Sequence, residues 1–442
     1  MLGRKIRNYL VVGMALGMVV LSGCGADKKS ETTQEQDNRT VLTLGNYNYN
    51  TLSSQISQYV DAFNQTNDTY RIEIRDYAEN EDCDTAFGLD MSAGKTPDII
   101  VTDRSRLDRL IHTGLLTDMQ SYLDADEELD RDDFMESVMS AWLQDDKLYY
   151  MALDYYINVL FGKEQTVGQF HNGWTKEEMI AFAEKTEVPL FYENDKMTMF
   201  DQFFVCGYSE FVDWDTGKAD FDSALFRRIL QYCDRGVKNS DRLPTGQEWI
   251  DEFKDDKYIL SSGSFQHFSD IEQFTRIFGQ DLCYIGFPNA YGDSSYMNFQ
   301  DCIGISSKSE YQDAAWSFIR SMFTKDAQYT FCQQTRWLSV RKDIFAMQKQ
   351  AAMATEPYTD AYGTQIEPII SSPDLIYDSL SQEEADLVEQ LVLGAKHCWK
   401  VDHNIGDIIY DEVSAYFNGD CSIDRVGETI NSRVETYMNE NR

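Results

Sequence analysis

The stretch VLTLGNYNYNTLSSQISQYVDAFNQTNDTYRIEIR, residues 41–75, decides the fold. It opens with an apolar run at 41–44, continues with apolar residues at helical spacing over 52–63, and ends with strict alternation at 71–75. These periods predict a strand, a helix and a half-buried strand. A third strand is predicted at 97–101, PDIIV. The β-α-β order predicts an α/β fold with mainly parallel sheets and helices on both faces.

The rest of the chain continues to alternate between strand and helix patterns. Three further strands are predicted, at 147–151, 159–161 and 257–260. Thr175 and Glu178 have the spacing of a capping box, which predicts that a helix begins there. Apolar stripes at helical spacing predict helices over 314–322 and 423–437. No internal repeat is visible.

Composition excludes several classes of protein. The chain has 442 residues, with 39 Lys and Arg against 75 Asp and Glu, which gives a formal net charge of −36. Nucleic acid is excluded as a main partner, because phosphate binding requires a basic surface. A hydrophobic content of 42% and an aromatic content of 13% indicate a globular chain. The length predicts two or three domains.

The N-terminus has the pattern of a bacterial lipoprotein signal. A cationic start at 4–7 precedes an apolar run at 9–21, about 13 residues long, which is too short to span a bilayer. The run ends in LSGC, which matches a lipobox with Cys24 as the lipid attachment site. We therefore expect a signal peptide at 1–23, a flexible tether at 24–40, and a body anchored at the outer face of the cytoplasmic membrane. The alternative is an ordinary secretory signal with an incidental cysteine.

The other cysteines and the acidic clusters give weaker signals. Eight cysteines remain besides Cys24, and an even number outside the cell permits disulfides, but free thiols are favoured. No C-x-x-C pair is present. Asp124 opens a stretch that begins like a calcium loop, yet Leu129 and Met135 stand where the loop needs Gly and Glu. His397 and His403 lack further ligands at suitable spacing, so we expect no metal and no cofactor.

Several short segments, in a fixed order behind the lipobox, carry a family resemblance. They are Gly94–Ile100, Gly114–Asp118 with Tyr122–Asp124, Gly173–Glu178, Ile303–Ser309 with Ala314–Ile319, and Tyr416–Gly419. In this order the chain resembles family 1 of the extracellular solute-binding proteins of ABC importers, which includes the maltose-binding proteins. Each segment is weak alone, and together they cover nearly the whole body.

The resemblance implies a two-lobe fold of the type II periplasmic-binding-protein kind, with strand crossovers as its hinge. The crossovers would fall near Leu153 and Gln300. Lobe 1 would comprise 41–152 and 300–340, and lobe 2 would comprise 153–299 and 341–442. It further implies a monomeric binding protein with no enzymatic activity, which passes a small-molecule ligand to ABC permease subunits.

Residues just beyond the predicted strand ends are the candidate ligand contacts, since ligands of such sheets bind there. With the positions that the family implies, they are Asn46, Tyr47, Tyr49, Asp103, Asp154, Tyr155, Phe265, Gln266 and Trp337. The alternatives are a polar surface loop for the first three, a helix N-cap for Asp103, a hinge role at 154–155 and core packing for Phe265. Trp337 departs from the glycine that relatives often carry.

The abundance of aromatic residues and carboxylates favours a carbohydrate ligand, and an oligosaccharide in particular. Sugars present apolar ring faces and a rim of hydroxyl groups, which flat aromatic side chains and acidic or amide side chains match. The alternatives are a peptide or polyamine as the solute, or a cell-surface glycoside hydrolase, which also uses aromatic residues and paired carboxylates.

Overall fold

The computed structural model of the chain describes residues 37–48, 52–78, 82–171, 173–192, 195–236, 246–292, 296–355, 358–359, 365–366, 379–398 and 402–441. The predicted signal peptide, Cys24 and most of the predicted tether lie outside these residues. The chain divides into two compact units, Met1–Asn38 and Arg39–Arg442, and every element below belongs to the second.

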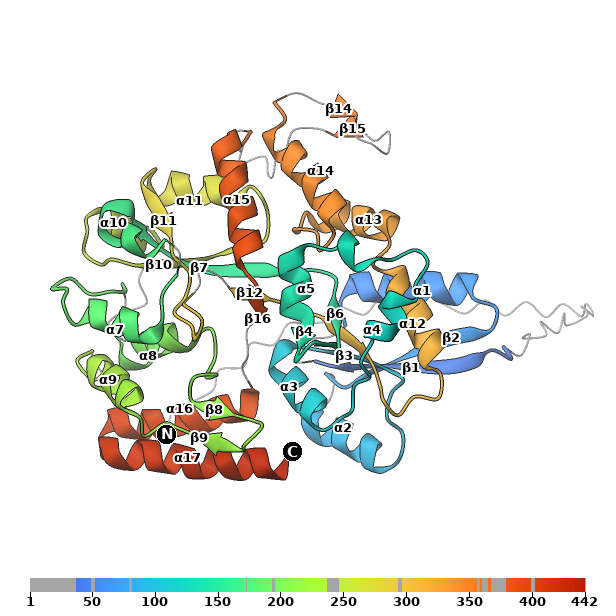
Figure 1. The fold of residues 1–442 in the computed structure, drawn as a ribbon, viewed down its shortest axis with the longest axis horizontal. Coiled ribbons are helices and arrows are strands. Elements are labelled where there is room, and N and C mark those ends of the chain that lie inside the picture. Colours follow the sequence, from blue (N-terminus) through green and yellow to red (C-terminus); the bar gives the residue numbers. More distant parts are fainter. Residues whose placement is uncertain are drawn as a thin grey trace, which may run out of the picture. The chain divides into compact units, whose positions relative to one another are not determined.

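The stretch predicted as β-α-β forms most of the first sheet (Figure 1). Its strands are β1 (Thr40–Tyr47), β2 (Tyr70–Asp76), β3 (Ile99–Thr102), β6 (Met151–Ala152) and β13 (Cys302–Ile305), in the order β2-β1-β3-β13-β6. Strand β1 is parallel to both neighbours, so that Leu44 lies opposite Ile74 and Ile99. Strand β13 is antiparallel to β3 and β6.

The second sheet is built around one long strand. Its strands are β7 (Tyr156–Lys163), β10 (Ser261–Phe265), β11 (Leu282–Tyr284), β12 (Tyr296–Asn298) and β16 (His397–Cys398). Strands β10, β11 and β12 are all antiparallel to β7, and only β16 is parallel to its neighbour β12. The predicted α/β class is therefore confirmed, but the sheets are mixed rather than mainly parallel, because antiparallel neighbours need no crossover helix.

The strand predicted at 257–260 is displaced. The strand in the structure is β10, which begins at Ser261, and Ser261 lies opposite Phe161 of β7. The amides of Ile259 and Leu260 instead donate to the carbonyl of Leu190, in a loop contact. Buried side chains at Tyr258 and Leu260 imitate a strand pattern without joining the ladder.

Helices surround both sheets (Figure 1). Before β7 they are α1 (Ser54–Thr66), α2 (Cys83–Ser92), α3 (Arg104–His112), α4 (Gln120–Asp124) and α5 (Glu136–Trp142). Between β7 and β13 they are α6 (Glu164–Val167), α7 (Lys176–Ala183), α8 (Lys196–Phe204), α9 (Ala224–Cys233), α10 (Gly246–Lys254) and α11 (Asp270–Phe278). After β13 they are α12 (Gln312–Ser321), α13 (Lys325–Thr335), α14 (Lys342–Met353), α15 (Gln382–Gly394), α16 (His403–Asn418) and α17 (Ile423–Glu440).

Short elements complete the described chain. Three antiparallel pairs are β4 (Leu143–Gln144) with β5 (Lys147–Leu148), β8 (Val212–Asp213) with β9 (Lys218–Ala219), and β14 (Tyr358–Thr359) with β15 (Gln365–Ile366). The 3-10 turns are η1 (Arg131–Asp133) and η2 (Gly168–Phe170). The capping box predicted at Thr175 and Glu178 is present at the start of α7.

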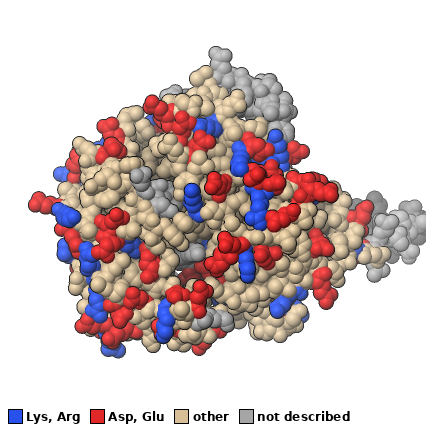
Figure 2. All heavy atoms as spheres, viewed as in Figure 1, with Lys and Arg blue, Asp and Glu red and all other residues tan. Residues whose placement is uncertain are grey.

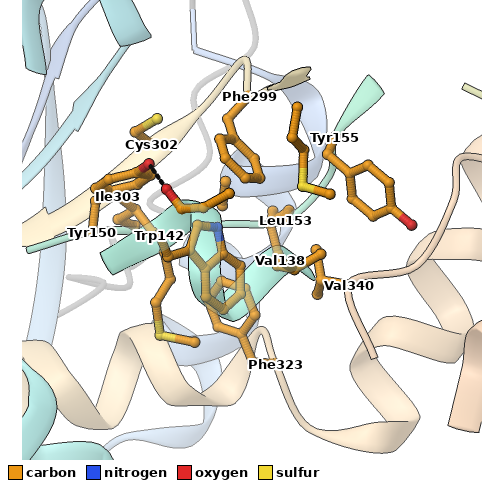
Figure 3. Packing of buried hydrophobic residues seen from close by; sticks show 14 of the residues in the cluster. Val138, Trp142, Tyr150, Leu153, Tyr155, Phe299, Cys302, Ile303, Phe323 and Val340 are labelled. Carbon is orange, nitrogen blue, oxygen red and sulfur yellow. Dashed lines mark hydrogen bonds between the residues drawn. The ribbon is translucent and has the colours of Figure 1, made fainter. Parts of the chain in front are cut away.

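The chain passes directly from one sheet to the other at residues 153–155, between β6 and β7, and at 299–301, between β12 and β13, and it returns to the second sheet between β13 and β16 through helices α12 to α15. Figure 3 shows side chains of both passages, among them Leu153 and Phe299, in one apolar cluster with Trp142 of α5. The Trp142 ring lies 6.3 Å from that of Phe299. The segments that join the sheets therefore pack on each other.

Two apolar clusters form the core. The first cluster covers the first sheet and continues over one face of the second sheet. The second cluster lies on the opposite face of the second sheet. Strand β7 divides them, because successive strand side chains point to opposite faces. Val159 and Phe161 belong to the first cluster, whereas Leu160 belongs to the second.

Candidate functional site

A cavity of about 820 Å³ lies where the two sheets meet. Its walls come from the loop after β1, the start of α3, the first residue of β7, the passage at 299–301, and helices α8 and α16. The volume is within the range of small-molecule sites. Segments attached to both sheets thus line one cavity, so a solute bound there would contact both.

The cavity is lined by polar and aromatic side chains together. The polar residues are Asn48, Ser53, Asp103, Arg104, Ser105, Asp201, Asn298, Gln300, Asp301, His403 and Asp407. The aromatic residues are Tyr156, Phe204, Tyr208, Phe299 and Tyr410. Tyr410 is 40% exposed, which is unusual for a large aromatic residue.

Two of the four lining carboxylates have a potential cationic partner. Asp103 caps α3 by accepting from the amides of Ser105 and Arg106, at 2.9 and 3.2 Å, and the Arg106 guanidinium lies 2.6 Å away. The Asp407 carboxylate lies 3.3 Å from Nε2 of His403, which pairs with it when protonated. Asp103 is therefore held in place by its own helix.

The other two carboxylates lie in a poorly solvated environment. Burial raises the pKa of Asp201 to about 6, although the Tyr410 hydroxyl donates a hydrogen bond to it. Burial also raises the pKa of Asp301, which accepts from Asn48 Nδ2 at 3.3 Å. Asp154 is buried behind this region, and burial together with the charge of Asp301 raises its pKa well above the ordinary value.

A smaller cavity of about 430 Å³ adjoins the first, with Tyr208 lining both. Here the ring of His112, at the end of α3, stacks on Trp214, in the turn between β8 and β9, with centroids 4.6 Å apart. Asp108 and Asp402 also line this cavity. Contact between the elements around the two sheets is thus not confined to the two passages.

Of the residues predicted after the first sheet's strands, Asp103 lines the larger cavity and also serves as the N-cap of α3. Asn46 is buried and donates from Nδ2 to Asp76 at 2.8 Å. Tyr47 is buried, and its ring stacks on that of Phe87 with the centroids 4.0 Å apart. The Tyr47 hydroxyl donates a hydrogen bond to Asp84. Neither Asn46 nor Tyr47 lines the cavity.

Tyr49 lies outside the described residues, as does Cys24.

Asp154 and Tyr155 lie in the first passage, and both are buried. They stand just before Tyr156, which does line the cavity. Phe265 is fully buried, with its ring 5.3 Å from those of Phe274 and Tyr284. Its place in the structure is the core position named as the alternative.

Gln266 and Trp337 are brought close to each other but do not line the cavity. The Leu338 amide donates to the Gln266 carbonyl at 2.8 Å, and the Trp337 carbonyl accepts from Gln348 Nε2 at 2.6 Å. The Trp337 ring packs against the first apolar cluster. These contacts connect the end of β10 to the segment before α14.

Sequence reasoning missed most of the lining residues. Asn48 lies two positions beyond a predicted residue, and Tyr156 one position beyond another. Asn298 and Asp301 flank the crossover expected near Gln300, so the expected position of the crossover points to these two lining residues. Asp201 and Tyr410 lie on amphipathic helices, where a polar side chain that faces a cavity has the same pattern as one that faces solvent.

Within the described ranges, no helix is both long and apolar enough to cross a membrane. No group of three or more His, Cys, Asp or Glu side chains in that part of the chain is arranged to hold a metal ion. The eight cysteines from Cys83 to Cys421, all of which the structure describes, form no disulfide, and the sequence favours mostly thiols.

Comparisons with known proteins agree with this architecture. A family model described as bacterial extracellular solute-binding protein matches residues 58–357. A search of the curated proteins finds no match.

Among solved structures, the sugar-binding protein MalE of Xanthomonas citri is 15% identical, with 91% of this chain and 98% of that chain covered and a TM-score of 0.54. An ABC substrate-binding protein of Listeria monocytogenes in complex with cycloalternan is 15% identical, with 91% and 100% covered and a TM-score of 0.53. An extracellular solute-binding protein family 1 member from Alicyclobacillus acidocaldarius is 14% identical, with 90% and 98% covered and a TM-score of 0.51. At these identities the likeness is one of fold.

Proposed function

Because the chain belongs to the bacterial extracellular solute-binding proteins, the substrate-binding components of ABC importers, we propose that it captures a carbohydrate in the 820 Å³ cavity and delivers it to a permease. The chain is a binding protein and not an enzyme. An oligosaccharide is the expected form of the ligand, since the adjoining cavity of about 430 Å³ extends the site past Tyr208.

The observation that carries the carbohydrate proposal is the composition of the cavity wall. Tyr156, Tyr208 and Tyr410 supply flat rings of the kind that pack against sugar ring faces. Asp201 and Asn298 supply acceptors and donors for hydroxyl groups. Two solved proteins with this fold are a sugar-binding protein and a substrate-binding protein in complex with cycloalternan, which makes carbohydrates the first class to test.

Delivery requires that the empty and loaded forms differ. The two sheets are joined at 153–155 and 299–301, and the cavity lies against the second of these passages. We propose that these passages form the hinge, between lobes bounded as the sequence predicts. A solute that contacts both lobes then stabilises the closed form by its differential affinity for it, and the permease recognises that form.

We also propose that Cys24 carries a lipid that anchors the body at the outer face of the cytoplasmic membrane. The support is the LSGC sequence behind a short apolar run. Replacement Cys24→Ser is expected to release the protein into the medium or periplasm and to abolish labelling by radioactive palmitate. Retention of both the label and the membrane association would contradict the anchor.

A thermal-shift screen tests the ligand class. Because a ligand that binds only the folded state raises Tm, we expect at least one oligosaccharide of a glycan panel to raise it, by an amount that grows with concentration. Product analysis of the same mixtures should show the sugar unchanged. A panel in which only peptides raise Tm would reject the carbohydrate proposal, and turnover of the sugar would reject the binding function itself.

A further inference from the structure

The charges that line the larger cavity are almost all of one sign. Four carboxylates line it, those of Asp103, Asp201, Asp301 and Asp407. Among the described lining residues none is a lysine, and Arg104 is the only arginine. Figure 2 shows acidic side chains spread over the whole visible face, with basic ones among them. The cavity therefore stands out by its lack of available basic groups, and not by its acidity alone.

The single arginine of the wall is already engaged by the protein. Arg104 is 2% exposed, its Nη1 donates to Asp108 at 2.8 Å, and its Nε donates to the Cys398 sulfur at 3.1 Å. Its positive charge is therefore opposed by Asp108 and does not compensate the cavity carboxylates.

The Nη2 of Arg104 has no hydrogen-bond partner in the described structure. A buried donor without an acceptor costs free energy, and a solute oxygen can remove that cost. This unpartnered nitrogen, on a residue of the cavity wall, is independent of the carboxylates. A ligand oxygen that reached this nitrogen would satisfy the donor.

Asp201 and Asp301 have no salt-bridge partner among the described ion pairs, unlike Asp103 and Asp407. The groups that act on Asp201 are the Tyr410 hydroxyl and the like charge of Asp195. Those that act on Asp301 are the hydroxyl of Ser53, Asn48 and the like charge of Asp103, and burial raises the pKa of both carboxyls.

Asp154 has a side-chain oxygen without a hydrogen-bond partner in the described structure, and its raised pKa means that it keeps its proton and adds no charge to the cavity. A buried carboxyl with no countercharge either keeps its proton or gains a cation. The aromatic rings of Tyr156, Tyr208 and Tyr410 complete a wall of the kind that also receives ammonium groups, through their negative ring faces.

We propose that the solute carries a protonated amine: within the carbohydrate class assigned above, on which this inference rests, it is an amino sugar whose ammonium group is bound in the cavity lined by Asp201 and Asp301. The hydroxyl oxygens of the same sugar accept from the donors of the wall, including Arg104. An acidic sugar is excluded, because its carboxylate would enter a cavity that offers no free cation among the described side chains.

The experiment compares three tetrasaccharides of one length and different charge by isothermal titration calorimetry. The probes are a glucosamine tetramer, which is cationic, its fully N-acetylated counterpart, which is neutral, and a galacturonic acid tetramer, which is anionic. We expect the cationic probe to bind about tenfold or more tighter than the neutral one and the anionic probe not to bind. Raising the salt concentration should weaken the binding of the cationic probe only.

Substitution assigns the effect to the cavity. Asp201→Asn and Asp301→Asn each keep the shape of the side chain and should weaken binding of the cationic probe about tenfold, which is more than they weaken binding of the neutral probe. Asp61→Asn is the matched control, because Asp61 is exposed on α1 and its replacement changes net charge equally. A similar loss in the control would assign the effect to the overall field of the protein and overturn the inference.

The outcomes separate this inference from the proposed function. If the neutral or the anionic probe binds more tightly than the cationic probe, the proposal of a protonated amine is overturned, and the proposal of carbohydrate binding stands. Binding of a linear polyamine such as spermidine, with no response to any sugar, supports the amine and overturns the carbohydrate class. If neither the cationic sugar nor the polyamine binds, the proposal that the solute carries a protonated amine is overturned.

Discussion

Asp201 shows how the fold sets the chemistry of a single residue. Burial raises the pKa of its carboxyl from the ordinary 3.8 to about 6, so the folded protein binds this proton more tightly than the unfolded chain. The stability that results is complete below about pH 4 and is lost as the pH rises through 6. At neutral pH the folded protein instead keeps a costly buried charge.

Replacement Asp201→Asn removes that charge and keeps an acceptor for the Tyr410 hydroxyl. We expect the free energy of unfolding of the variant, relative to that of the wild type, to rise by about 1 to 2 kcal/mol between pH 4 and pH 8. Urea denaturation at several pH values measures it. A difference that does not change with pH would show that Asp201 titrates normally in the folded state.

Tyr47 tests the distinction between a core position and a ligand contact. Its ring is buried against Phe87 and its hydroxyl donates to Asp84. Tyr47→Phe should therefore lower the free energy of unfolding by about 1 kcal/mol and leave solute affinity unchanged. Unchanged stability together with lost affinity would instead restore Tyr47 as a ligand contact. Denaturation curves and titrations on one preparation decide between the two.

At the residue scale the sequence located the right loops more reliably than the right side chains. Tyr47 and Tyr49 are predicted contacts, and Asn48 between them lines the cavity; Tyr155 is a predicted contact, and Tyr156 lines the cavity. A loop beyond a strand end can be recognised from periodicity, but which of its residues face the cavity depends on backbone conformation. In a strand, a shift of one position reverses the direction of the side chain.

Strand β13 packs at Gly304 closely against the backbone of Tyr149. A Cβ atom at Gly304 would stand 2.6 Å from the Tyr149 carbonyl oxygen, which belongs to the backbone and cannot move aside as a side chain can. Gly304→Ala should therefore lower the free energy of unfolding by about 2 kcal/mol or more, through displacement of β13 from its neighbours. Thermal and urea denaturation measure the loss.

The matched control is Gly88→Ala. Gly88 lies within α2, and a Cβ atom there would meet no atom within 4 Å. Alanine should stabilise this helix by about 0.5 to 1 kcal/mol, because glycine loses more backbone entropy on folding. If both variants are destabilised equally, close packing at Gly304 is not the cause.

Elements with a local signal were predicted well, and those defined by partners were not. Thr175 and Glu178 specify the start of α7 within four residues of sequence, and the structure contains that capping box. The strand predicted at 257–260 has the right side chains, but strand pairing is decided by the partner, and β7 pairs with Ser261–Phe265. The antiparallel pairings of β7 likewise connect residues far apart in the chain.

At the scale of the whole molecule, the cavity is a product of tertiary structure. Asp201 of α8 and Tyr410 of α16 meet across more than two hundred residues of sequence, and no short motif contains both. The passages at 153–155 and 299–301 are placed by the topology of the two sheets. The α/β class follows from local periodicity, whereas the set of residues around the cavity requires the folded chain.

The central claim is that a sugar binds in the cavity between the two sheets, and one calorimetric comparison tests it most directly. The wild type, Tyr410→Ala and Tyr311→Ala are titrated with the oligosaccharide that raises Tm most. Tyr410, 40% exposed, lines the cavity, whereas Tyr311, 37% exposed, lies on the surface before α12. We expect one site per chain, an affinity about tenfold or more weaker in Tyr410→Ala, and no change in Tyr311→Ala. Equal affinity in all three proteins would contradict the claim.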